Sequence, residues 1–315
     1  MVVVSGTKLA AEIDVSRSAV WRMVQQLRGY GVPIEGHPTT GYALKQVPDL
    51  LLPDALEPQL KPTIFSGKVQ HRFRTASTNA DAMQAAARGA PEGSVFVAEE
   101  QTAGRGRGGH SWHSAKGQGI YCSVILRPQM PPADVLILSL ATGLAAQAAV
   151  QQVTESHPDL RWPNDLLLNG KKFCGILAEM NAEATRVRYV VVGIGMNVNH
   201  LEFPRELRDE ATSLRLANTR VAQPPSAVSP AVIPRSPLLA ALLKSLDREY
   251  RDLQPAGIIA RFMENSSIAR GRRVHVEERG GYDGVTEGLD ERGFLRVRTR
   301  EGSRTVLSGG VRAVD

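Results

Sequence analysis

The sequence predicts an α+β protein of three folded parts: a small helical module with a β-hairpin, a central mixed-sheet α/β domain, and a small C-terminal β-barrel of the SH3-like kind. The length of 315 residues exceeds that of one typical domain. Helical periodicity at the start gives way to alternating strand and helix patterns, and the chain ends in short strand-like runs separated by glycines. We therefore expect the three parts to span residues 1–47, 63–266 and 267–315, with a linker over 48–62.

The first part carries two helical patterns and a hairpin pattern. Residues 8–13 form an amphipathic run, and Ser16 can cap a second helix over 17–28. Residues 34–44 then predict two short strands around a turn, so the order is that of a winged helix-turn-helix. A complete module has a further helix before Lys8, and only seven residues precede it. We expect a truncated module or a misassigned start.

The polar side of the second helix offers hydroxyl and guanidinium groups, which bind phosphates and base edges. A net charge of +6 and a pI near 9.5 also suit a phosphate-rich partner. A helical hairpin that packs on the next domain is the alternative. The predicted DNA contacts are Ser16, Arg17, Ser18, Trp21 and Arg22.

The central part shows a regular alternation of strand and helix patterns. Prolines over 48–62 predict the linker before it. Residues 218–237, which are low in complexity, predict a mobile insert. Strands are expected over 69–73, 94–99, 120–126 and 188–193, helices over 80–88, 133–154 and 238–253, and a hairpin with an Asn-Gly turn at 169–170.

The composition indicates a cytoplasmic protein with no membrane partner. The two cysteines, Cys122 and Cys174, are too few for a disulfide framework and lack zinc-ligand spacing. No run of 18 apolar residues occurs, and the first residues do not have the pattern of a signal peptide.

A glycine-rich loop is the most informative motif. Residues 104–109 read Gly-Arg-Gly-Arg-Gly-Gly after the apolar run 95–98. Glycines let the backbone approach a ligand, and the arginines add fixed positive charge, so the loop is expected to hold a polyphosphate. The match to Gly-x-Gly-x-x-Gly is accidental, because no helical pattern follows it, and no P-loop motif occurs. His110 and His113 lack the further ligands of a metal site.

Two further motifs carry polar or small residues beside buried strands. Residues 161–165 read Arg-Trp-Pro-Asn-Asp, and Lys172 lies one hairpin further on. A lysine so placed can bridge two anions, and Asp165 can hold a metal or orient a polar ligand. A polar turn with a solvated lysine explains the spacing equally well. Residues 193–199, Gly-Ile-Gly-Met-Asn-Val-Asn, leave room for a ligand or another backbone.

Together these motifs resemble the biotin protein ligases that double as biotin operon repressors. The resemblance spans nearly the whole chain apart from the linker and the insert. It implies a central domain of the class II synthetase-like kind. The residues that carry it are 76–79, 98–109, Trp112, 161–165, Lys172, 175–177 and 193–197.

The resemblance implies a reaction and its partners. Such ligases join biotin to ATP, giving biotinyl-adenylate and pyrophosphate, and then pass biotin to a lysine of a biotin carboxyl carrier protein, a subunit of acetyl-CoA carboxylase. Implied ligands are ATP, biotin and Mg²⁺. Implied partners are the carrier protein, operator DNA and a second copy of the chain when the adenylate is bound.

The resemblance also implies site residues. Lys172, Arg107 and Asp165 are the implied catalytic residues, and Asp165 is the implied Mg²⁺ ligand. Helix capping is the alternative role for Ser77 and Thr78, as core packing is for Trp112. The implied biotin contacts are Ser77, Thr78, Asn79, Gln101, Arg105, Gly106, Arg107, Lys172 and Gly175. The implied contacts to ATP and the adenylate are Arg105, Arg107, Trp112, Asn164, Asp165 and Asn197.

Two departures and two rival functions accompany the resemblance. The family usually has lysine at the position of Arg161, and several members carry a third arginine at the position of Gly108. A lipoate-type acyl ligase on the same fold is one rival. A DNA-binding repressor whose ligase domain is only a sensor is the other.

Overall fold

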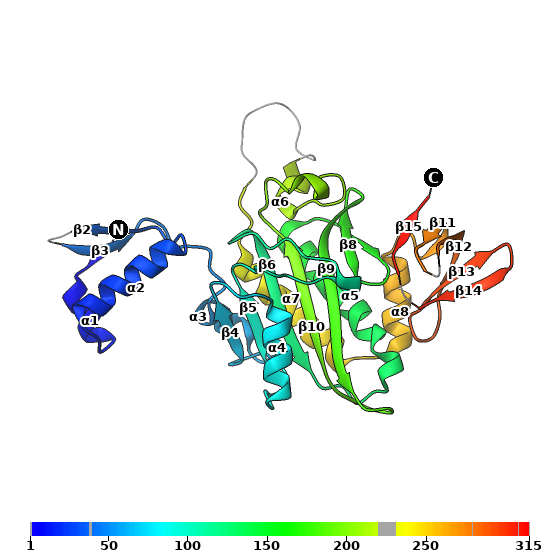
Figure 1. The fold of residues 1–315 in the computed structure, drawn as a ribbon, viewed down its shortest axis with the longest axis horizontal. Helices are drawn as coiled ribbons and strands as arrows, with labels where there is room; N and C mark the ends of the chain where they lie inside the picture. Colours follow the sequence, from blue (N-terminus) through cyan, green and yellow to red (C-terminus); the bar gives the residue numbers. More distant parts are fainter. Residues whose placement is uncertain (1, 38–39, 220–230, 279, 308, 315) are drawn as a thin grey trace. The chain divides into compact units, whose positions relative to one another are not determined.

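The computed structural model describes residues 2–37, 40–219, 231–278, 280–307 and 309–314 (Figure 1). The chain divides into two compact units, Met1–Leu50 and Leu51–Asp315, and each is described by itself.

The first unit is a helix-turn-helix with a small antiparallel sheet, as predicted. Ser5 and Ser16 cap its two helices, because their hydroxyls accept from the backbone N–H groups of Lys8 and Ala19 at 3.1 Å each. The cap at Ser5 starts the first helix two residues earlier than predicted. Buried side chains of both helices form a small core. The elements are α1 (Gly6–Glu12), α2 (Arg17–Gly29) and strands in the order β1 (Val3–Val4), β3 (Gly41–Leu44), β2 (Ile34–His37).

A seven-stranded mixed sheet forms the centre of the second unit. Strands β4 and β5 pair in parallel, and the other neighbouring strands pair antiparallel. The Asn169-Gly170 turn between β8 and β9 has positive φ at both residues, as an Asn-Gly hairpin requires. The strand order is β4 (Val69–Arg72), β5 (Val95–Ala98), β6 (Gly119–Leu126), β10 (Val187–Asn197), β9 (Lys171–Ala182), β8 (Asp165–Leu168) and β7 (Asp159–Arg161).

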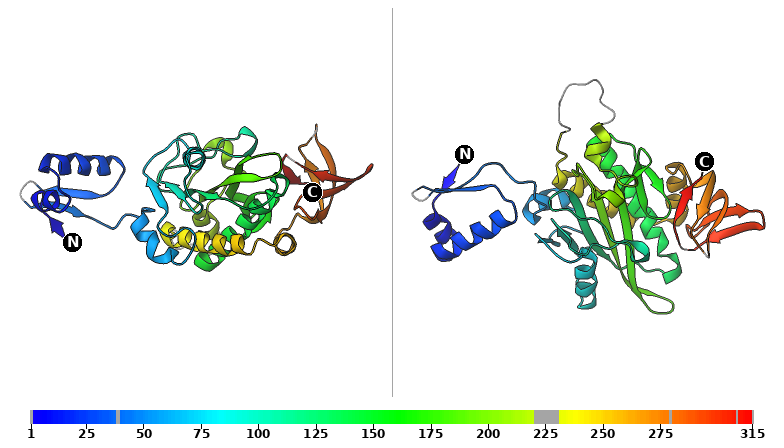
Figure 2. Two further views of the ribbon diagram at one scale, coloured as in Figure 1. Left: turned by 90° about the horizontal axis from the view of Figure 1, so that it is seen from below. Right: turned by 45° about the horizontal axis from the view of Figure 1, so that its top comes forward.

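Helices cover both faces of this sheet (Figures 1 and 2). Helix α4 (Thr78–Ala87) packs on one face, and α5 (Leu136–Thr154) and α7 (Arg235–Arg251) pack on the other. Helix α8 (Pro255–Glu264) packs against α5. By length and composition alone, Pro132–Thr154 could cross a membrane, but 78% of that stretch is buried inside the fold. Its apolar composition is therefore that of a core helix. Sequence patterns did not predict α8.

The segment predicted as a linker instead contains a helix. Helix α3 (Pro53–Leu60) packs against α7, and Leu51, Leu56 and Leu60 are fully buried. Pro53 stands in the first turn, where a missing backbone N–H costs nothing. The prolines thus mark a helix start here, and the linker prediction is wrong for residues 53–60.

The end of the chain forms a five-stranded antiparallel sheet. The four predicted runs are strands, and β15 was not predicted. Closure of this sheet into an SH3-like barrel stays a prediction. The indole N–H of the buried Trp162 donates to the carbonyl of Gly293 at 2.8 Å and so ties this sheet to the central one. The strand order is β14 (Gly302–Val306), β13 (Leu295–Thr299), β12 (Tyr282–Leu289), β11 (Arg270–Val276), β15 (Val311–Ala313).

The described residues of the predicted insert and both cysteines belong to the second unit. The predicted insert over 218–237 overlaps the end of α6 (Leu214–Thr219) and the start of α7, and its residues 220–230 lie outside the described residues. Cys122 in β6 and Cys174 in β9 are fully buried and unbonded. Burial raises the pKa of the Cys122 thiol to about 12 and raises the pKa of the Cys174 thiol as well.

Candidate functional site

One pocket in the second unit gathers most of the predicted ligand-site residues. Its empty space of about 440 Å³ includes part of the open solvent at its mouth. Of the residues predicted to bind biotin or ATP, all but Asp165 and Asn197 line it. The predicted residues in its lining are Ser77, Thr78, Asn79, Gln101, Arg105, Gly106, Arg107, Trp112, Asn164, Lys172 and Gly175.

The start of α4 supplies a set of buried polar groups to this pocket. The backbone N–H and the hydroxyl of Thr78 donate to Gln101 Oε1 at 2.8 and 3.1 Å. Asn79 Nδ2 donates to Glu179 Oε2 at 2.8 Å. Ser77 stands at the N-cap without a capping bond from its side chain, so the capping alternative is not supported there. These contacts hold polar atoms toward the pocket in fixed directions.

Ser123, which the sequence analysis did not single out, supports two residues of the pocket lining from outside it. Its hydroxyl lies 2.8 Å from Thr78 Oγ1 and 2.6 Å from Asn79 Oδ1. It is fully buried in β6. The available signal was a serine among the mainly apolar residues of a buried strand. Such a residue normally needs a buried partner.

Glycines on β9 and β10 make room for two side chains that lie against the sheet. An added Cβ at Gly193 would overlap the side-chain amide of Asn79. An added Cβ at Gly195 would lie 2.5 Å from Trp112 Nε1, and one at Gly175 would lie 3.0 Å from Trp112 Cζ3. The indole N–H of Trp112 is buried and has no hydrogen-bond partner among the described residues. The ring therefore forms one wall of the pocket.

The glycine-rich loop folds back on itself beside this wall. The Gly106 N–H donates to the His110 carbonyl at 2.7 Å, and the Trp112 N–H donates to the Gly104 carbonyl at 2.9 Å. Gly108 has φ +63°, a conformation that side chains rarely adopt. A glycine at this position thus suits the backbone of this loop.

Arg107 reaches from the loop to the polar turn after β7. Its NH1 group donates to Asn164 Oδ1 at 3.2 Å. Burial lowers the pKa of the Arg107 guanidinium, and the nearby Asp165 carboxylate opposes that shift. Asn164 is fixed in turn, because its Nδ2 donates to the Ile176 carbonyl at 2.8 Å and its own carbonyl accepts from the Ile176 N–H at 2.9 Å.

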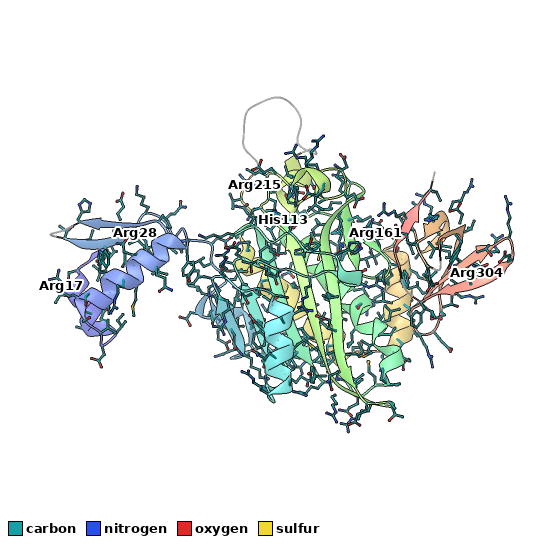
Figure 3. All side chains as sticks on the ribbon, in the orientation of Figure 1. Arg17, Arg28, His113, Arg161, Arg215 and Arg304 are labelled. Atoms are coloured by element: carbon teal, nitrogen blue, oxygen red, sulfur yellow. The ribbon has the colours of Figure 1, made fainter. Side chains whose placement is uncertain are left out.

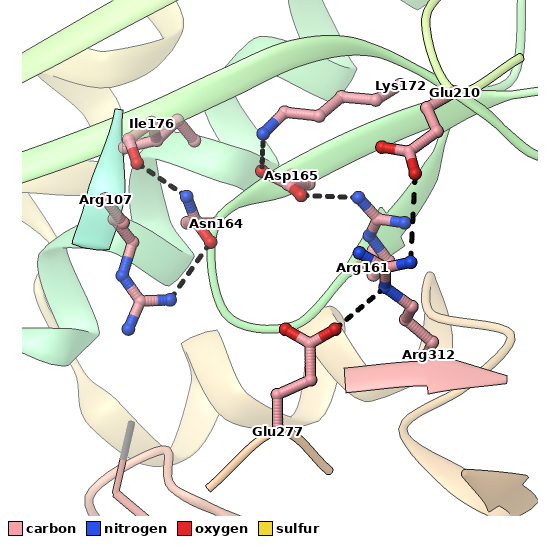
Figure 4. Close-up of polar contacts among 9 residues, drawn as sticks. All are labelled: Arg107, Arg161, Asn164, Asp165, Lys172, Ile176, Glu210, Glu277 and Arg312. Carbon is pink, nitrogen blue, oxygen red and sulfur yellow. Dashed lines mark hydrogen bonds and ion pairs between the residues drawn. The ribbon is translucent and has the colours of Figure 1, made fainter. Parts of the chain in front are cut away.

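Lys172 is held by a carboxylate rather than solvated. Its Nζ lies 2.6 Å from Asp165 Oδ1, and Arg161 NH2 donates to Asp165 Oδ2 at 2.7 Å (Figure 4). Lys172 Nζ also lies 5.4 Å from the centre of a Trp112 ring, within cation–π range. The alternative of a solvated lysine on a polar turn is therefore not supported. Asp165 stands behind Lys172 and does not line the pocket.

The described residues do not form a protein-held metal site. No group of three His, Cys, Asp or Glu among them could hold a metal ion. Both oxygens of Asp165 are already paired with cations, so the residues present do not fit the predicted Mg²⁺ ligand. Asn197 is buried at the end of β10 and donates to the Thr212 carbonyl at 3.1 Å. Its Oδ1 has no partner in the described part of the chain.

The predicted DNA contacts lie together on helix α2 of the first unit. Ser16 at the N-cap, Arg17, Ser18, Trp21 and Arg22 are all exposed, and 56% of Trp21 is accessible to solvent. Figure 3 marks Arg17 near the start of this helix and Arg28 near its end. The Arg28 Nε group donates to the Ile34 carbonyl at 2.9 Å and so fastens the helix to the hairpin.

Comparison with known proteins finds relatives over both units. Residues 72–197 match the biotin/lipoate A/B protein ligase family, and residues 2–43 match an HTH domain. The bifunctional ligase/repressor BirA of Bacillus subtilis is 34% identical over 98% of this chain and 93% of its own length. A biotin–[acetyl-CoA-carboxylase] ligase of Mycobacterium tuberculosis is 36% identical over 74% of this chain and 84% of its own length.

Solved structures show the same fold. The biotin protein ligase from Aquifex aeolicus in complex with biotin and ATP superposes with a TM-score of 0.64 at 27% identity. The match covers 79% of this chain and all of that one.

Proposed function

This chain belongs to the family of bifunctional biotin protein ligases that carry an N-terminal helix-turn-helix repressor domain, and we propose that it activates biotin with ATP and transfers it to a lysine of a biotin carboxyl carrier protein. The observation that carries the proposal is the pocket itself. Arg105, Arg107 and Lys172 line it beside a set of buried polar groups, and no acidic residue is found in its described lining. A triphosphate and a carboxylate, both anions, suit this distribution of charge.

The first step joins two anions. An oxygen of the biotin carboxylate attacks the α-phosphorus of ATP, the bond from that phosphorus to the bridging oxygen breaks, and pyrophosphate leaves. The Lys172 ammonium between carboxylate and phosphate would offset their repulsion and favour in-line attack. Arg105 and Arg107 would bind phosphate oxygens, with Arg107 directed by Asn164.

The second step uses the biotinyl-5′-AMP that the first step forms. The amine of the carrier lysine attacks the acyl carbon of biotinyl-5′-AMP, AMP departs with the bonding electrons, and the attacking nitrogen loses a proton. Water would destroy the adenylate, so the loop 104–112 and the Trp112 ring, both beside the pocket, would shield it.

The start of α4 favours biotin over lipoate. The ureido ring of biotin offers N–H and C=O groups, whereas the dithiolane ring of lipoate offers none. Ser77, Thr78, Asn79 and Gln101 present hydroxyl and amide groups at one side of the pocket. A dithiolane could exchange no hydrogen bonds with these groups, so it would gain less affinity from them than a ureido ring.

We infer that Mg²⁺ would travel with the nucleotide phosphates, because Asp165 is already paired with Lys172 and Arg161. The exposed polar face of α2 supports binding to operator DNA. We further propose a homodimer when the adenylate is bound, a closed SH3-like barrel at the C-terminus, and a cytoplasmic location.

The test is biotin-dependent release of pyrophosphate from ATP, followed by transfer of biotin to a purified carrier domain. Lys172→Ala should lower the rate of adenylate formation about 100-fold or more, because an ammonium that stabilises transition-state charge is lost. The matched control is Lys171→Ala, since Lys171 bonds the Arg208 carbonyl and does not line the pocket. A wild-type chain without biotin-dependent release would contradict the proposal, as would a near-normal rate for Lys172→Ala.

A further inference from the structure

We propose that Arg161 is a positioning residue that takes up the charge of Asp165, so that Lys172 keeps its own charge available to anions in the pocket. This inference rests on the proposed ligase function and deepens it. Arg161 is the last residue of β7 and lies outside the described pocket lining.

The hairpin of β7 and β8 fixes the geometry. Arg161 and Asp165 are direct register partners in this antiparallel pair, so their side chains leave the same face of the sheet. Arg161 NH2 lies 2.7 Å from Asp165 Oδ2, and Lys172 Nζ lies 2.6 Å from Asp165 Oδ1. Two cations thus share one carboxylate, one oxygen each, as Figure 4 shows.

The three side chains form a series that ends at the pocket. Lys172 lines the pocket, and Asp165 and Arg161 follow behind it. The Asp165 side chain is 13% exposed, against 29% for Arg161 and 30% for Lys172. Arg161 can therefore influence the pocket through Asp165 without touching a ligand.

The net charge of Arg161, Asp165 and Lys172 determines how strongly Lys172 can attract an anion in the pocket. An isolated pair of Asp165 and Lys172 would be neutral, and its carboxylate would compete with the substrates for the ammonium. With Arg161 the series carries one net positive charge, and the attraction of Asp165 is divided between two cations. Because these side chains are partly shielded from water, such interactions are stronger than at an open surface. The expected result of losing Arg161 is weaker anion binding in the pocket.

Lysine is the conservative replacement for Arg161 in the test. A single NH2 group contacts Asp165, so the charge matters more here than a two-pronged fork. Lysine at position 161 should therefore restore the function, and a neutral residue should not.

The experiment measures anion binding and adenylation separately. Arg161→Met should weaken the binding of inorganic tripolyphosphate, followed by calorimetry, about tenfold, and raise KM for ATP by a similar factor. Arg161→Lys should stay within about twofold of the wild type, since its charge is kept. The control is Arg261→Met in α8, whose arginine pairs with Glu249 at 2.6 Å.

A double-mutant comparison tests the route through Asp165. In an Asp165→Asn background, Arg161→Met should have little further effect, whereas independent sites add. Full additivity would overturn the inference, and so would wild-type tripolyphosphate affinity in Arg161→Met. If that variant does not fold, Arg161→Gln takes its place with the same expected result. A wild type that binds tripolyphosphate but forms no adenylate would contradict the ligase function and leave the role of Arg161 measurable.

Discussion

Gly195 and Ser123 each shape the pocket through one small group. Gly195 has only a hydrogen at the position where any other residue would place a Cβ 2.5 Å from atoms of the Trp112 ring. The Ser123 hydroxyl similarly fixes Thr78 and Asn79 from beneath. The loop and Lys172 were predictable from the sequence because their residue types form local motifs. Ser123 was not, because the bonds of one buried hydroxyl depend on side chains that are 44 and 45 positions away in the chain.

Replacing Gly195 tests the wall of the pocket. In Gly195→Ala the new methyl group would lie 2.5 Å from Trp112 Nε1, so the ring must shift. We expect the affinity for biotin to fall about tenfold while the fold survives, because the ring belongs to a loop and not to a core helix or strand. Calorimetry and tryptophan fluorescence measure both changes. Gly257→Ala is the control, since its Cβ would meet nothing within 4 Å. Unchanged biotin affinity in Gly195→Ala would refute the assigned role.

Among the helices and strands, α3 in the proline-rich segment before the central sheet could not be predicted from the sequence pattern. A short helix with one buried edge has few periodic positions, and its two prolines resemble those of a linker. Only the tertiary fold shows that Leu56 and Leu60 meet the central core. Strands such as β6 and β10 were predictable because long buried runs of branched residues leave few alternatives.

Truncating a buried leucine measures what α3 contributes to stability. Leu56→Ala leaves a cavity under a fully buried side chain and should lower the free energy of unfolding by about 2–5 kcal/mol. Leu52→Ala is the neighbouring control, because Leu52 is 38% exposed. Urea denaturation of both variants compares them. Equal midpoints would mean that α3 is not part of the cooperative fold.

At the scale of the whole chain, the two units have separate cores. The core of the first unit contains Ala10, Val20 and Val24, and the main core of the second begins at Leu51. The proposed boundary between central and C-terminal parts is less distinct, because Trp162 and Gly293 join them inside one compact unit. Sequence patterns placed one division within residues 48–62 and a second between 266 and 267, and the second stays a prediction.

Removing residues 1–47 tests the independence of the ligase. Since the second unit keeps its whole core, pyrophosphate release should stay within about twofold of the full chain. Gel shift with the biotin operon promoter, in the presence of biotin and ATP, should show DNA binding for the full chain and none for the shortened one. Complete loss of ligase activity would show that the units are not separable.

The buried thiols have a practical consequence. Cys122 and Cys174 lie inside the central sheet with raised pKa values, so neither presents a thiolate to reagents while the fold is intact. We therefore expect no reaction of the native chain with maleimides. A single cysteine introduced on an exposed face could carry a fluorophore with no background from the wild-type residues, and the appearance of two further reactive thiols would count unfolded molecules directly.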